Sequence, residues 1–177
     1  MSDDVGGSYP GNNEPESGSG AADHSRFPRI VADTLSGRTL VLPDSLDSGL
    51  AVVALVFRRH AQPVVDSWLG PLARRLGGHR SVGLYEIPML AGGWRMMSGF
   101  IDSGMRSGIP PHKHHMVATC YGDLSRVRSA LDIHDLDSVY VYLIDGSGSV
   151  HWRADGWAVP RRIEDLMNVV NRHTDMT

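Results

Sequence analysis

The chain has 177 residues, which suffice for one domain with a core of its own and are few for two. Hydrophobic residues make up 41% and charged residues 21%, a globular composition, and the net charge of −3 argues against a nucleic-acid-binding surface, which requires a basic excess. The only cysteine, Cys120, excludes an internal disulfide, a CxxC redox pair and a cysteine-rich zinc site.

The beginning of the chain differs in composition from the rest. It is rich in Gly, Ser, Asn, Pro and acidic residues and offers almost no apolar surface to bury. Such a segment cannot offset its ordering entropy, so we predict a disordered tail at residues 1–25 and a folded domain at residues 26–177. We see no signal or transit pattern, and the longest apolar run, Leu50 to Phe57, has strand length. We therefore expect a cytoplasmic protein without stable membrane insertion.

Short apolar runs alternate with helical periodicity after the tail. The run that ends at Phe57 is apolar throughout, as is typical of a central strand covered on both faces. Gly70-Pro71 lies inside the next predicted helix and predicts a kink there, and Pro88 is expected to end the strand after that helix. In chain order the predicted elements are a strand at Thr39–Leu42, a strand at Leu50–Phe57, a helix at Val64–Leu76, a strand at Val82–Ile87, a helix at Trp94–Arg106, a strand at Met116–Tyr121, a helix at Leu124–Leu131, two strands at Tyr140–Ile144 and Ser149–Trp152 around an Asp-Gly-Ser-Gly turn, and a helix at Arg161–His173.

Three of these helices carry apolar residues at helical spacing, which predicts the face that each one buries. Alternation followed by a terminal hairpin and helix indicates an α/β fold: a mixed sheet with helices on both faces and a C-terminal β-hairpin and helix. The predicted faces are Val65, Trp68, Leu72 and Leu76; then Trp94, Met97, Ile101 and Met105; then Ile163, Leu166, Met167 and Val170.

Several ordered blocks resemble known families. The runs LAVVALVFRRHAQPVVDSWLGPL, VGLYEIPML and VYVYLIDGSGSVHW are similar to the layout of thioredoxins and peroxiredoxins, in which an apolar strand leads into the active-site turn. More specifically, the chain resembles the thioredoxin-like ATP-ten family of mitochondrial ATP synthase assembly factors, over about residues 36 to 170. The residues that carry this resemblance are Phe57, Trp68, Tyr85 to Pro88, Phe100 to Pro110, Tyr121 to Asp123, Val139 to Trp152, Gly156 and Glu164.

The residues of thioredoxin redox chemistry are missing from the matching positions. The turn after Phe57 contains no cysteine, whether it is aligned on Pro63 or on Pro71, and the usual cis-proline corresponds to Val139. The resemblance therefore implies a thioredoxin-like fold with a non-catalytic assembly or chaperone role. It also implies a protein client, of the kind of a membrane-protein subunit of an ATP synthase, and no cofactor. We see no mitochondrial presequence, so the mitochondrial setting is not carried over.

Two features predict where a client segment binds. The carboxyl end of a central strand is where α/β sheets place their sites, and cations there suit an acidic partner. Methionine-rich surfaces adapt to varied apolar segments. The alternatives are a solvated strand end and a helical stripe that simply packs onto the sheet. The predicted partner-binding residues are Arg58, Arg59, His60, Gln62, Pro63, Trp94, Met97 and Met105.

Two other functions rest on single features. Cys120 could act as the thiol of a one-cysteine peroxidase or reductase, although a buried strand cysteine is more often structural. His112, His114 and His115 could bind a metal, because alternation in an extended segment would put His112 and His114 on one face. The alternative is that these histidines belong to a solvated polar segment after Pro110-Pro111 and bind no metal.

Overall fold

A mixed sheet organises the part of the chain that the computed structural model describes, which is residues 26–46, 49–77, 79, 81–122 and 124–174, without the side chains of 95–97 and 100. The predicted tail at 1–25 lies outside the described residues, so the tail and the domain boundary stay predictions. The strands are β1 (Ile30–Thr34), β2 (Thr39–Leu42), β3 (Leu50–Val56), β4 (Val82–Ala91), β5 (Ala118–Gly122), β6 (Val139–Asp145) and β7 (Val150–Asp155), in the spatial order β2-β1-β5-β4-β3-β6-β7.

The three central strands run parallel to one another, and the strands at both sides are antiparallel to their inner neighbours. Strand β3 pairs in parallel with β4, which pairs in parallel with β5. Strand β1 is antiparallel to β5, and β6 is antiparallel to β3. The helices are α1 (Gln62–Leu76), α2 (Ser98–Gly108), α3 (Leu124–Leu131) and α4 (Pro160–Thr174), with 3-10 turns η1 (Arg59–Ala61), η2 (Gly92–Met97) and η3 (Pro111–Lys113).

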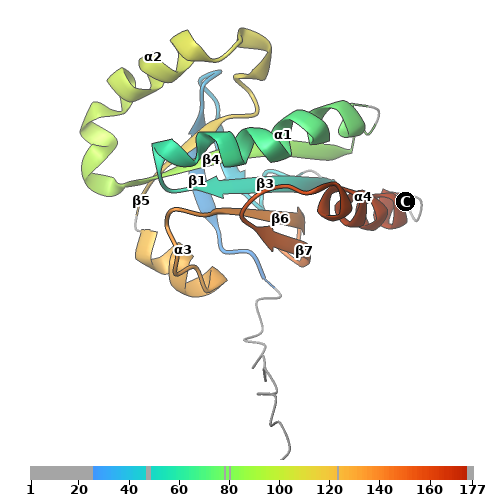
Figure 1. Cartoon of the computed structure of the whole chain (residues 1–177). Coiled ribbons are helices and arrows are strands. Elements are labelled where there is room, and N and C mark those ends of the chain that lie inside the picture. The colour runs from blue at the N-terminus through green and yellow to red at the C-terminus, as the bar shows by residue number, and fades with distance from the viewer. Residues whose placement is uncertain (1–25, 47–48, 78, 80, 123, 175–177) are drawn as a thin grey trace, which may run out of the picture.

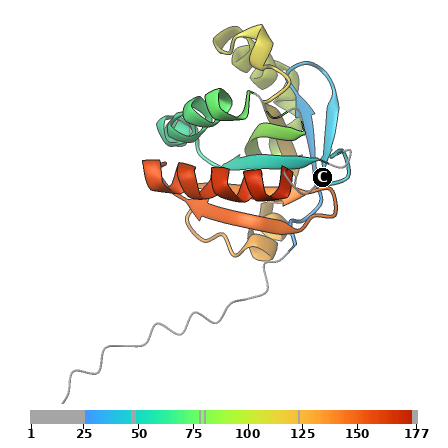
Figure 2. The same ribbon diagram turned by 90° about the vertical axis from the view of Figure 1, so that its right-hand side faces the viewer.

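Two apolar cores lie on opposite faces of the sheet. Helices α1 and α4 cover one face and α3 covers the other, as Figures 1 and 2 show. Because side chains alternate along a strand, β3 divides between the cores: Val52 and Ala54 pack under α1, and Val53 and Leu55 pack on the side of α3. The predicted mixed sheet with helices on both faces is therefore confirmed. No helix in the described ranges has both the length and the apolar character needed to cross a bilayer.

The predicted apolar faces of the first and last helices are confirmed residue by residue. Helix α1 buries Val65, Trp68, Leu72 and Leu76, and α4 buries Ile163, Leu166, Met167 and Val170. Trp68 has no exposed surface; its indole Nε1 donates a 2.7 Å hydrogen bond to the carbonyl of Gly156, and its ring meets Trp152 edge-on. This bond ties α1 to the segment between β7 and α4.

Strand β1 is the element that the sequence analysis missed. It is only five residues long, and its exposed positions hold one apolar and one acidic residue, Val31 and Asp33, so the apolar–polar alternation expected of a strand is not visible in its sequence. It forms a hairpin with β2 through a turn in which Gly37 has a φ of 86°, a conformation that favours glycine. Its other edge pairs with β5, so the hairpin extends the sheet beyond the predicted strands.

The prediction that Pro88 ends its strand is wrong, because β4 continues to Ala91. Pro88 pairs with Val56, the last residue of β3, so the ladder on that side is already complete. The ladder with β5 takes over at Met89 and holds the strand extended for three more residues. Pro88 thus lies between the bridge of Glu86 with Val117 and the ladder with β5, a position that tolerates the missing N–H.

Replacing Trp68 with alanine should lower the free energy of unfolding by about 3–5 kcal/mol, because a fully buried indole and its hydrogen bond are both lost. Urea denaturation measures the change. Trp157→Ala is the matched control: Trp157 is 59% exposed, so its loss should alter stability by less than about 0.5 kcal/mol. Equal effects of the two changes would contradict the described packing of α1.

Candidate functional site

The chain leaves the central strand through a short turn that opens helix α1. Arg58 is extended, with a φ of −134°, η1 follows, and α1 begins at Gln62. Pro63 lies in the first turn of α1, where its missing N–H costs nothing, whereas Pro71 lies inside the helix. The turn after β3 therefore leads directly into Pro63, and the described turn contains no cysteine in either of the two alignments. Val139 opens β6 and pairs with Val56, beside this turn.

A groove of about 940 Å³ runs between α1 and α2 and has strand β4 as its floor. Helix α2 is anchored away from α1: its Asp102 accepts a 3.0 Å hydrogen bond from the Tyr121 hydroxyl on β5, and the Arg106 Nε donates a 2.8 Å bond to the carbonyl of Leu35. The strip of β4 between the helices is therefore left open. We call this cavity the α1–α2 groove; its lining includes Val56, Asp66, Leu69, Glu86, Pro88, Leu90, Ile101, Met105 and Met116.

Four of the predicted partner-binding residues meet in the α1–α2 groove. Arg58, Arg59 and Gln62 line it from the turn after β3, and Met105 lines it from α2. Lys113 in η3 also lines it, a cation that the sequence analysis did not include. The turn and the methionine-containing insert, which were predicted from separate signals, thus contribute to one cavity.

Three other predicted partner-binding residues, His60, Pro63 and Trp94, do not line the α1–α2 groove. The His60 Nε2 lies 3.2 Å from a carboxylate oxygen of Asp137, and Pro63 is used in the first turn of α1. Trp94 is 52% exposed in η2, so the predicted apolar stripe through Trp94 is wrong. The α-helix begins only at Ser98, and the 3-10 turn before it has a different period. The side chain of Met97 lies outside the described part of the structure.

Glu86 is a groove residue that was not among the sequence-predicted site residues. It lines the α1–α2 groove from the middle of β4 and is only 6% exposed. Its backbone is fixed, because its N–H donates a 2.8 Å hydrogen bond to the carbonyl of Met116 and its other neighbour is Ala54 of β3. The signal in the sequence was a single charged residue inside the otherwise apolar run VGLYEIPML.

The surroundings of Glu86 disfavour its charged form. Burial raises the pKa of this carboxyl above its usual 4.5, a hydrogen bond with the side chain of Gln62 lowers it in part, and the nearby carboxylate of Asp66 raises it again. The Gln62 amide also donates a 3.2 Å hydrogen bond to Asp66. Among the described residues, no lysine, arginine or histidine forms an ion pair with Glu86.

Cys120 lies on the opposite side of the sheet from the α1–α2 groove. It is 7% exposed and belongs to the core under α3. Its neighbours in β5, Thr119 and Tyr121, face the other way, toward Asp102 of α2. The thiol is therefore separated from the turn that in thioredoxins carries the active site.

The three histidines do not form the predicted extended pair. Pro111–Lys113 is a 3-10 turn, with backbone bonds from Lys113 to Pro110 and from His114 to Pro111, so strand alternation does not apply. The His114 Nε2 lies 2.8 Å from the carbonyl oxygen of Ile109, whereas His112 and His115 are exposed. Within the described ranges, no three His, Cys, Asp or Glu side chains are placed to hold a metal ion.

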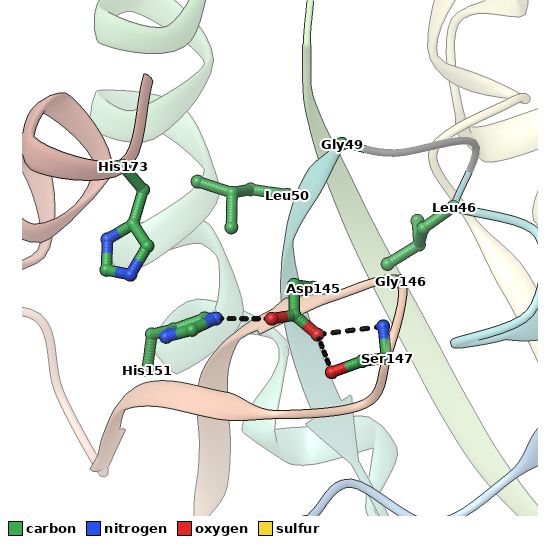
Figure 3. A pocket seen from close by; sticks show the side chains of 8 residues that line it. All are labelled: Leu46, Gly49, Leu50, Asp145, Gly146, Ser147, His151 and His173. Atoms are coloured by element: carbon green, nitrogen blue, oxygen red, sulfur yellow. Dashed lines mark hydrogen bonds and ion pairs between the residues drawn. The ribbon is translucent and has the colours of Figure 1, made fainter. Parts of the chain in front are cut away.

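A second, shallower pocket of about 500 Å³ lies at the other end of β3, where Leu50 pairs with Asp145 (Figure 3). Asp145 accepts hydrogen bonds from the backbone and hydroxyl of Ser147 and lies 2.7 Å from the His151 Nε2, whose ring contacts that of His173. Burial alone would raise the pKa of Asp145, but the bonds from Ser147, His151 and Ser149 outweigh it and lower the pKa to about 2. These contacts stabilise the predicted hairpin turn.

Comparisons with known proteins agree with the fold and with the sequence resemblance. The family model described as ATP10 protein matches residues 21–172. A comparison with curated protein sequences found no match.

Solved structures share the architecture at low sequence identity. The thioredoxin domain of a thiol-disulfide oxidoreductase from Bacteroides vulgatus is 12% identical with a TM-score of 0.56, and the match covers 83% of this chain and 96% of that one. Sco1 from yeast is 14% identical with a TM-score of 0.56, covering 84% and 96%. BsSco, a member of the Sco family of cytochrome c oxidase assembly proteins, is 11% identical with a TM-score of 0.57, covering 83% and 94%. These likenesses confirm the thioredoxin-like fold.

The change Glu86→Gln should raise the free energy of unfolding at pH 8 and have little effect near pH 4. The folded state raises the pKa of Glu86, so ionisation destabilises it once the pH exceeds the usual range of a carboxyl. Below that range the group is protonated in both the folded and unfolded states, and the gain vanishes. Glu164→Gln, at an exposed position of α4, is the control and should show no such trend. Urea denaturation across this pH range measures both, and a pH-independent effect at Glu86 would contradict its burial.

The Cys120 thiol should react slowly with a disulfide reagent such as Ellman's in the native protein and rapidly in strong denaturant, because its side chain is buried in β5. Cys120 is the only cysteine, so the released chromophore reports on it alone. Rapid labelling without denaturant would favour the one-cysteine enzyme.

Proposed function

The chain belongs to the ATP10 protein family, and from this membership together with the α1–α2 groove we propose that it is an assembly factor that holds a segment of a client protein without carrying out chemistry on it. Because the sequence resembles ATP synthase assembly factors, the client that we propose is a membrane-protein subunit of an ATP synthase. The proposal concerns binding, since the turn after β3 contains no cysteine.

The observation that carries this proposal is the composition of the α1–α2 groove. Most of its lining is apolar, from Leu90 on the floor to Leu69 and Ile101 on the two helices. Met105 and Met116 add flexible side chains that can adjust to different apolar shapes. An open apolar cavity of this kind, floored by a rigid sheet, suits the apolar side chains of a client segment.

The size of the α1–α2 groove supports a short segment as the occupant. Small-molecule pockets span roughly 300–1,000 Å³, and a cavity of about 940 Å³ is at the upper end of that range. It can take several side chains of a client but not a folded domain. A contact of this extent is weak enough to be released when the client enters its complex, as an assembly factor requires.

The cations at the edge of the α1–α2 groove supply a polar anchor. Arg58 and Arg59 are exposed where the chain leaves β3, and Lys113 faces the same cavity from η3. Arginine pairs well with carboxylates, so acidic or polar groups that flank an apolar client segment can bind there. We further propose that the protein is inactive in thiol–disulfide exchange, because exchange needs an attacking and a resolving thiol and Cys120 is the only cysteine.

The double change Arg58→Ala with Arg59→Ala should weaken client binding about tenfold, the effect of roughly 1.4 kcal/mol, and should leave folding intact. Exposed arginines contribute little to stability, so the melting temperature should hardly move. The measurement is recovery of ATP synthase subunits from detergent-solubilised membranes of the native host on the immobilised protein, quantified by mass spectrometry.

Arg161→Ala with Arg162→Ala is the matched control, because these consecutive exposed arginines open α4 and do not line the α1–α2 groove. The control should recover as much client as the parent protein. The proposal fails if no ATP synthase subunit is enriched, or if both double variants recover the client equally well.

A further inference from the structure

Glu86 is the only charged residue that is buried in the described part of the molecule. Burying a carboxylate is costly unless a cation or several hydrogen bonds compensate it. Glu86 has the Gln62 amide, but the other charged group that acts on it is Asp66, which carries the same sign. A glutamate at this place weakens the fold, and a buried position of this kind in a groove indicates a role in binding.

The acidic and basic residues that line the α1–α2 groove come from different elements of the fold. Asp66 on α1 and Glu86 on β4 are acidic, whereas Arg58, Arg59 and Lys113 come from the turn after β3 and from η3. The lining residues of α2, which include Ile101 and Met105, are uncharged. None of the three cations forms an ion pair with Glu86 in the described structure, although all of them line the same cavity.

On these grounds we propose that the α1–α2 groove selects client segments that carry a lysine or arginine among apolar residues, and that Glu86 receives this cation. The inference rests on the proposed function, because it names the chemistry of the client that the same groove holds. A basic side chain is the complement that Glu86 lacks, and its aliphatic stem suits the apolar lining on the way to the floor. The surrounding apolar side chains exclude water, so the pairing discriminates strongly between charged and uncharged segments.

The position of Glu86 in the fold suits a residue that discriminates between client segments. Its backbone is paired with Ala54 on one side and is bonded to Met116 on the other, and its carboxyl forms a hydrogen bond with the Gln62 side chain, so the carboxyl is oriented before a client arrives. A preorganised charge loses little entropy on binding. Gln62 lies between Glu86 and Asp66 and can keep its hydrogen bonds while a cation approaches from the cavity.

The test compares two short synthetic peptides of leucine and alanine that differ at one central position, lysine in one and norleucine in the other. Norleucine has the aliphatic stem of lysine without its charge. The parent protein should bind the lysine peptide about tenfold more tightly, and Glu86→Gln should abolish the difference. Glutamine keeps the shape of the side chain and its contact with Gln62, and circular dichroism verifies that the variant is folded.

Glu164→Gln is the matched control, since it makes the same change at an exposed site outside the α1–α2 groove and should keep the preference for lysine. If the parent binds both peptides equally, or if Glu86→Gln keeps the preference, the inference is overturned while the proposed function stands. If the parent binds neither peptide, the proposed function fails as well.

Discussion

Strand β3 is the constraint on which the rest of the structure depends. It pairs along its whole length with β4 on one edge and β6 on the other, and every residue except Leu50 is buried. Because both faces are covered, its alternate side chains divide the interior into a core under α1 and α4 and a core under α3. Its two ends then define two separate places: the turn at Arg58 opens the α1–α2 groove, and the start at Leu50 adjoins the hairpin pocket of Asp145.

The α1–α2 groove exists because two helices over one sheet face are anchored to different strands. Helix α1 is held toward α4 through Trp68 and its bond to Gly156, on the side of β3 and β6. Helix α2 is held over β5 by Asp102. The residues of β4 that point between the helices, Glu86 among them, therefore face a cavity rather than a core. A carboxyl that would be too costly under a closed helix pair is tolerated there.

The turn after β3 shows how one fold can carry different functions. In a thioredoxin this place holds the paired cysteines, and here Arg58, Arg59 and Gln62 line a groove instead. Cys120, the only thiol, is buried in the core under α3, on the face of the sheet opposite to the α1–α2 groove. The structure thus combines a thioredoxin-like fold with a groove at the end of its central strand.

Local patterns determined most of the architecture. Periodicity identified the buried faces of α1 and α4, and the fully apolar run identified β3. Each buried position requires an apolar residue, so burial leaves a pattern that is visible within the segment itself. Strand β1 and the continuation of β4 past Pro88 were not predicted, because both depend on pairing with β5, which is distant in the sequence.

The sequence also determined that Arg58, Arg59, Gln62 and Met105 are candidates for binding. Only the tertiary structure decided that these residues share a groove, that Trp94 and His60 stay outside it, and that Glu86 lies on its floor. The part of a sheet that two helices leave uncovered depends on contacts between segments that are far apart in the chain. Such contacts leave no periodic pattern in the sequence.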